Sequence, residues 1–70
     1  MKRKRYGVIL EYLEKGVWKY LRIEYFNSLK KAEERKNYIN NNCVEHRAYG
    51  IFDYEKATYK YIINEEKKED

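Results

Sequence analysis

Residues 6–26 read YGVILEYLEKGVWKYLRIEYF, and this stretch decides the fold. Apolar side chains recur at every second position over Tyr6–Leu13, which is the period of a β-strand. Lys15-Gly16 interrupts the alternation, and glycine readily takes the positive φ that a tight hairpin turn requires. β-Branched and aromatic residues then resume over Val17–Phe26. The stretch therefore predicts a β-hairpin with a two-residue loop.

The length of that loop sets the register of the hairpin. A two-residue loop gives three facing pairs: Leu10 with Leu21, Val8 with Ile23, and Tyr6 with Tyr25. A three-residue loop would divide the apolar side chains between both faces of the hairpin. We therefore expect the two-residue register, with the apolar set on one face.

The rest of the chain predicts one helix and two more strands. Asn27-Ser28 is a helix start signal, because a short oxygen-bearing side chain accepts from the free N–H groups of the first turn. Helix-forming residues without glycine or proline fill Leu29–Asn40, and the asparagines of residues 40–42 are expected to end the helix with a left-handed cap. Val44–Phe52 and Ala57–Ile63 have strand character, with Tyr59, Tyr61 and Ile63 on one face of the second.

The element order predicts an α+β domain: a four-stranded antiparallel sheet (ββαββ) with one helix packed on one face. Within the third strand, Gly50 indicates a bulge or a close backbone approach. We expect a basic N-terminal arm at 1–5, a single domain at 6–63 and a charged tail at 64–70. The predicted core is Val8, Leu10, Leu21, Ile23, Leu29, Ala32 and Ile39.

Composition excludes several classes of protein. Seventy residues allow one domain, and nine Tyr, two Phe and one Trp are too many aromatic residues for a disordered chain. A single cysteine excludes an intramolecular disulfide framework. No apolar run is long enough for a transmembrane helix or a signal peptide, so we expect a cytoplasmic protein that has no membrane partner.

The net charge of +4 is unevenly distributed. Four of the positive charges lie in the arm, on Lys2, Arg3, Lys4 and Arg5. The tail at 64–70 carries four acidic and two basic residues, so the body between the two ends is close to neutral. Such a body lacks the broad positive face of a protein that binds duplex DNA.

The sequence offers no convincing catalytic or metal site. Cys43 and His46 have a spacing found in metal sites, but zinc needs three or four ligands and no further Cys or His is present. The acidic pair Glu33-Glu34 lies on a charged helix, where lysines and arginines at helical spacing indicate a solvated face. No glycine-rich phosphate loop occurs. We expect a protein that is not an enzyme and that uses no cofactor or metal.

The sheet face that the helix leaves uncovered is the candidate binding site. Its expected side chains are Trp18, Tyr20, Arg22, Arg47, Tyr59 and Tyr61. Aromatic and arginine side chains of this kind are enriched at protein–protein hot spots. They also stack on single-stranded nucleic acid, and in that alternative Lys2, Arg3, Lys4 and Arg5 would contact phosphates. A third alternative is that several tyrosines only fill a small core.

The run from Trp18-Lys19-Tyr20 through Phe26-Asn27-Ser28 to Glu33-Glu34 resembles small proteins of phages and mobile elements. In these, a hairpin with Trp-Lys in mid-strand leads into a helix that starts F-x-S-x-K-x-A-E. The resemblance covers residues 6–40 and implies a stoichiometric, anti-CRISPR-like inhibitor that blocks a host protein. The run also resembles the arm-binding domains of phage integrases, which read DNA and place three strands before the helix.

Self-association is a further expectation from the sheet. An open four-stranded sheet has two edges with unpaired backbone groups, and the chain contains no proline to protect either edge. We therefore expect that two copies of the chain can associate as a homodimer.

Overall fold

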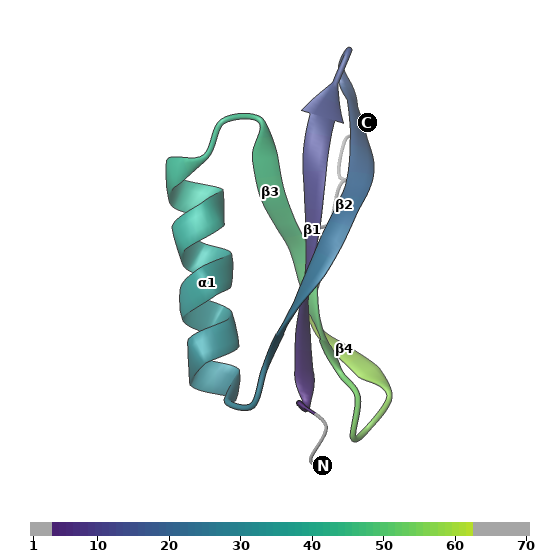
Figure 1. Ribbon diagram of the computed structural model, residues 1–70, viewed down its shortest axis with the longest axis vertical. Helices are drawn as coiled ribbons and strands as arrows, with labels where there is room; N and C mark the ends of the chain where they lie inside the picture. The colour runs from purple at the N-terminus through teal and green to yellow at the C-terminus, as the bar shows by residue number, and fades with distance from the viewer. Residues whose placement is uncertain (1–3, 63–70) are drawn as a thin grey trace, which may run out of the picture.

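The computed structural model describes residues 4–62 and confirms the predicted α+β architecture in the order ββαββ (Figure 1). Its elements are β1 (Tyr6–Glu14), β2 (Val17–Phe26), α1 (Leu29–Asn42), β3 (His46–Asp53) and β4 (Thr58–Ile62). The expectations for Lys2, Arg3, Ile63 and the tail at 64–70 lie outside the described residues.

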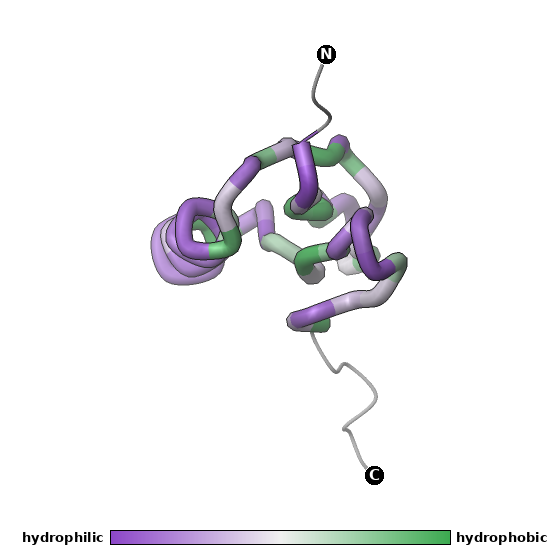
Figure 2. The backbone as a smooth tube through the Cα atoms, turned by 90° about the horizontal axis from the view of Figure 1, so that it is seen from below, coloured by the Kyte–Doolittle hydropathy of each residue, from purple (hydrophilic) through white to green (hydrophobic). Residues whose placement is uncertain are grey.

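The four strands form one antiparallel sheet in the order β2-β1-β3-β4. Strands β2 and β3 both lie beside β1, so they run parallel to each other, and α1 connects them across one face of the sheet. Figures 1 and 2 show α1 on one side of the twisted sheet, and it packs mainly against β3. Within residues 4–62, no helix is long and apolar enough to cross a membrane.

The hairpin turn has the predicted two-residue loop. Lys15 and Gly16 both have positive φ, at 52° and 79°, which is the signature of a type I′ turn. Next to the turn the register is also as predicted, with Glu14 opposite Val17 and Glu11 opposite Tyr20.

Beyond Glu11 the predicted hairpin register is wrong, because β2 contains a bulge. Leu10 lies opposite Arg22 and Ile9 opposite Ile23, which leaves Leu21 as an extra residue in β2. The three pairs expected from the loop length are therefore all displaced by one residue: Leu10 with Leu21, Val8 with Ile23, and Tyr6 with Tyr25. A one-residue displacement exchanges the two faces of a strand, so the second half of β2 has the opposite orientation to that predicted.

Strands β3 and β4 each contain a bulge as well. The pairing of β1 with β3 shifts between Ile9 and Leu10, leaving Tyr49 as the extra residue, and the pairing of β3 with β4 leaves Lys60 as another. All three extra residues lie on the side of the sheet that carries α1, because Leu21 shares a hollow with helix residues and Tyr49 and Lys60 share a second one. Bulges increase the local twist, and Figure 1 shows a strongly twisted sheet.

The helix begins as predicted and ends two residues later. The side chain of Ser28 accepts a hydrogen bond from the backbone N–H of Lys31 at 3.4 Å. At the other end Cys43 has an extended conformation, so the expected left-handed asparagine cap is wrong. Asn40 instead has a tertiary role, since its side chain accepts from the Ala48 N–H at 2.8 Å and donates to the Ala48 carbonyl at 3.3 Å. This pair of bonds attaches α1 to β3.

The core lies between the sheet and α1. Val8, Leu10, Ala32 and Ile39 are buried there as predicted, and Leu21 and Leu29 pack against them while partly exposed. The placement of Ile23 in this core is wrong, because the bulge turns it to the other face of the sheet. Buried side chains that the pattern did not identify include those of Tyr6, Ala48, Ile51 and Asp53.

Arg5 is part of the folded body and not of a separate arm. Its guanidinium donates to both carboxylate oxygens of Asp53, at 2.9 and 3.0 Å, and also pairs with Glu55 at 2.7 Å. The backbone N–H of Tyr54 donates to the carbonyl of Arg5 at 2.8 Å. Arg5 therefore contacts the folded domain through both its side chain and its backbone carbonyl.

Gly50 has a close backbone approach, which is one of the two features that the sequence predicted at this position. A Cβ at this position would collide with the backbone carbonyl oxygen of Tyr61 in β4. We expect Gly50→Ala to lower the free energy of unfolding by about 1–3 kcal/mol, because a backbone atom cannot rotate away from the added methyl group. Chemical denaturation measures the loss, and equal stability of the variant and the wild type would contradict this packing.

Candidate binding surface

The face of the sheet opposite α1 is uncovered within the described residues. Residues directly opposite each other in neighbouring strands point to the same face, so the register identifies which side chains lie there. We call this surface the open face. Its strand positions are Gly7, Ile9, Glu11, Leu13, Trp18, Tyr20, Ile23, Tyr25, Arg47, Gly50, Phe52, Tyr59 and Ile62.

An aromatic row crosses the open face at one register level. Tyr25, Gly7, Phe52 and Tyr59 are successive partners in β2, β1, β3 and β4. Tyr54, from the turn after β3, contributes a ring between those of Tyr25 and Phe52. The centroid of the Tyr54 ring lies 5.8 Å from that of Tyr25 and 4.8 Å from that of Phe52. The centroids of Phe52 and Tyr59 are 4.9 Å apart. Four rings therefore contact one another in sequence across the sheet.

Gly7 makes room for the central ring of this row. A Cβ at Gly7 would lie 2.9 Å from the Cε2 atom of Tyr54 and 2.9 Å from the Cγ2 atom of Ile23. Because β1 has no side chain here, the Tyr54 ring lies against the strand backbone. Burial, together with a hydrogen bond to Tyr25, raises the pKa of the Tyr54 hydroxyl.

An aliphatic row lies next to the aromatic row. Ile23, Ile9, Gly50 and Ile62 are its register partners across the four strands. No member of this row carries a charge, so it extends the apolar area of the open face towards the hairpin turn.

A partly buried ion pair lies beyond the aliphatic row. Arg47 donates to Glu11 at 2.8 Å, and their side chains are only 14% and 18% exposed. The guanidinium of Arg47 also lies 4.3 Å from the ring centroid of Trp18, in a cation–π contact. The ion pair balances both charges at this end of the open face, and the cation–π contact places Arg47 against the Trp18 ring.

Several large side chains on the open face are well exposed. Tyr20 is 62% exposed, Tyr25 49% and Tyr59 50%. Soluble monomers rarely leave large contiguous apolar patches uncovered, and such patches commonly mark interaction sites. The open face is therefore the candidate binding surface of the described residues.

The structure places four of the six predicted site residues on one face of the sheet. Trp18, Tyr20, Arg47 and Tyr59 lie on the open face as expected. The expectation that Arg22 and Tyr61 share this face is wrong. Arg22 follows the bulge in β2 and bonds to Glu24 at 2.9 Å beside α1.

Tyr61 is turned to the helix side by the bulge in β4. Its hydroxyl donates to Glu33 of α1 at 2.6 Å, and this bond raises the pKa of the hydroxyl. Regular strand alternation, without bulges, would place both Arg22 and Tyr61 on the open face. The expectation for these two residues is wrong because it did not include the bulges.

The sequence pattern missed three members of the aromatic row: Tyr25, Phe52 and Tyr54. Tyr25 was expected on the core side, from the register that the bulge overturns. Tyr54 lies in a turn, where alternation gives no orientation. A signal was available in Gly7, because a glycine in mid-strand indicates that another group lies close to the backbone.

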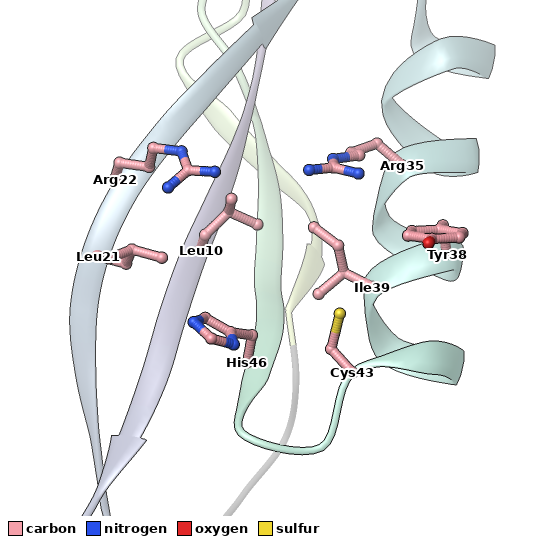
Figure 3. A pocket seen from close by; sticks show the side chains of 8 residues that line it. All are labelled: Leu10, Leu21, Arg22, Arg35, Tyr38, Ile39, Cys43 and His46. Atoms are coloured by element: carbon pink, nitrogen blue, oxygen red, sulfur yellow. The ribbon is translucent and has the colours of Figure 1, made fainter.

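Cys43 and His46 contribute to a hollow on the opposite side, between α1 and the first two strands (Figure 3). Within residues 4–62 no group of three or more His, Cys, Asp or Glu side chains is placed to hold a metal ion. The pair therefore has no third ligand among these residues.

No protein-family model matches this chain, and no match was found among curated proteins or solved structures.

Proposed function

We propose that this protein is a non-catalytic binding protein whose open face contacts another protein. The observation that carries the proposal is the contiguous row of four aromatic rings, flanked by aliphatic side chains and partly exposed. Rigid aromatic side chains contribute large contact areas with little loss of conformational entropy, and they are enriched at hot spots of protein interfaces.

The charges on the open face support a protein partner over a nucleic acid. The charged strand positions described there are Glu11 and Arg47, and they pair with each other. Single-stranded nucleic acids are bound by aromatic rings together with basic side chains that neutralise phosphates. Arg22 lies on the other side of the sheet, and Arg5 is held by Asp53, so neither supplies that charge to the open face.

The resemblance to small phage proteins gives the proposal a more specific form. A host protein would be inhibited stoichiometrically when the open face covers its functional surface, as in the anti-CRISPR-like proteins that the sequence resembles. The edge of β2 is ten residues long, contains no proline and has no partner strand within residues 4–62, which supports a homodimer as a second mode of association.

The proposal predicts that open-face tyrosines control partner capture. Protein captured from a bacterial lysate by the wild type should fall at least about tenfold with a Tyr20→Ala/Tyr59→Ala variant, since two exposed hot-spot residues are removed. Quantitative mass spectrometry of the captured protein, with nuclease present, provides the measurement. Tyr38→Ala is the matched control, because Tyr38 is similarly exposed but lies on α1.

Three outcomes would contradict the proposal. One is equal capture by the wild type and the double variant. Another is capture that disappears when nuclease is added, which would favour nucleic-acid binding. The third is affinity for single-stranded oligonucleotides that falls steeply with added salt, because counterion release is characteristic of phosphate contacts. Light scattering of the purified protein tests the homodimer separately.

A further inference from the structure

The hollow on the helix side is separate from the open face and has a different chemistry. It measures about 230 Å³ and lies between α1, β1, β2 and the start of β3 (Figure 3). Leu10, Leu21 and Ile39 give it apolar walls. Its other lining residues are Arg22, Arg35, Tyr38, Cys43 and His46, so no carboxylate lines it. Figure 3 shows Arg22 and Arg35 pointing towards each other from the strand and the helix.

Glu24 holds the two arginines in place. Its carboxylate accepts from Arg35 at 2.8 Å and from Arg22 at 2.9 Å. These bonds lower the pKa of Glu24, so the carboxylate is ionised at neutral pH. Two positive groups and one negative group leave this side of the hollow with one excess positive charge.

From this arrangement we infer that the hollow binds a small organic monocarboxylate. The carboxylate would face Arg22 and Arg35, whose planar guanidinium groups match its geometry. The aliphatic body would lie against Leu10, Leu21 and Ile39. Glu24 engages Nε and Nη2 of both arginines, so within residues 4–62 it leaves their Nη1 donors for the ligand.

The charge and the size of the hollow define the class of ligand. One excess positive charge complements a monoanion better than a phosphate dianion. At about 230 Å³ the hollow is smaller than the roughly 300–1,000 Å³ of pockets that hold drug-sized ligands, so it suits a short organic chain. Hexanoate has eight non-hydrogen atoms and is a suitable probe.

Cys43 gives a direct readout, because it lines the hollow and is the single cysteine of the chain. Iodoacetate and iodoacetamide alkylate thiols by the same reaction, in which the sulfur displaces iodide from the methylene carbon and the thiol proton passes to solvent. The two reagents differ in charge. The ratio of their rates at Cys43, measured by intact mass, therefore reports whether the hollow concentrates a small carboxylate.

We expect iodoacetate to be favoured at Cys43 by at least about fivefold relative to the same ratio for N-acetylcysteine. Its rate should saturate with concentration, and millimolar hexanoate should protect Cys43 from both reagents. Arg22→Gln should remove the preference, since Arg22 is more than half exposed and Glu24 keeps its bond to Arg35. Circular dichroism checks that this variant folds.

Matched controls separate a local site from the general positive charge of the chain. Lys30→Gln removes one exposed charge from the first turn of α1 and should keep the preference. 1-Hexanol, an uncharged probe, should protect Cys43 far less than hexanoate. The Tyr20→Ala/Tyr59→Ala variant should bind hexanoate normally, because its substitutions lie on the open face.

The inference is overturned if the rate ratio equals that of N-acetylcysteine. It is also overturned if Lys30→Gln lowers the ratio as much as Arg22→Gln does, or if 1-hexanol protects as well as hexanoate. Equal protection by inorganic phosphate would contradict the assignment to a monocarboxylate. None of these outcomes bears on protein binding by the open face.

Discussion

Replacing Ile51 by alanine is expected to cost about 2–5 kcal/mol of unfolding free energy. Ile51 is fully buried at the centre of the sheet, between Val8 of β1 and Tyr61 of β4. A domain of 70 residues has a total stability of roughly 4–10 kcal/mol. The cavity left by the truncated side chain should therefore remove much of the stability of the fold. Chemical denaturation followed by circular dichroism measures the loss.

The matched control is the same substitution on the other face of the sheet. Ile23 is only partly buried and lies on the open face, so Ile23→Ala should cost about 1 kcal/mol or less. The hairpin register predicted from the sequence would instead place Ile23 in the core and make its truncation as costly as that of Ile51. Equal losses for the two variants would show that the bulge in β2 is absent.

The second large effect is expected from Asp53, a fully buried carboxylate. It accepts two hydrogen bonds from Arg5, one from the backbone N–H of Glu55 at 3.0 Å and one from that of Lys56 at 3.3 Å. These bonds lower the pKa of Asp53 from 3.8 to about 2, and those from Arg5 have the largest effect. Burial alone would raise the pKa, but the two backbone bonds also lower it. The folded state therefore favours the ionised form.

This pKa predicts that the protein loses stability in acid, and it predicts the pH range of the loss. Because the folded pKa lies below the unfolded one, the contribution of Asp53 to stability is complete above about pH 4. It is lost as the pH falls towards 2. We expect Asp53→Asn to melt well below the wild type at pH 7, since the amide cannot accept from Arg5 at both positions. The difference in melting temperature should narrow between pH 4 and pH 2.

Glu55→Gln is the control for this prediction. Glu55 also pairs with Arg5, but its side chain is 66% exposed, so its removal should change the melting temperature little at any pH. If the difference in melting temperature between the wild type and Asp53→Asn stayed constant from pH 7 to pH 2, the predicted dependence of stability on the ionisation of Asp53 would be contradicted.

Local signals in the chain were sufficient for the element order and for several of the connections. Lys15-Gly16 forms the predicted two-residue turn, Ser28 caps the helix, and Gly50 has the expected close approach. The turn and the cap depend on the conformational preference of one or two residues and their immediate neighbours, and the glycine marks in its own strand where β4 comes close. That is why a single sequence reveals them.

Only the tertiary structure decided which side chains share a face. The alternation of apolar residues cannot show that Leu21, Tyr49 and Lys60 are extra residues. A bulge costs local hydrogen bonds and is stabilised by packing between strands and against the helix, which are contacts distant in sequence. Each bulge reverses the orientation of the residues after it, so the positions of Arg22 and Tyr61 changed with it.

Some residues of the candidate binding surface could be identified from the sequence, and others only from the tertiary structure. The sequence by itself determined that many aromatic residues must lie on strands, and it identified Trp18, Tyr20 and Tyr59 for the uncovered face. The tertiary structure added the Tyr54 ring, placed over Gly7 by the pairing of β1 with β3 and the turn that follows. It also paired Arg5 with Asp53, 48 residues along the chain. Both depend on long-range proximity, which arises only when the sheet assembles.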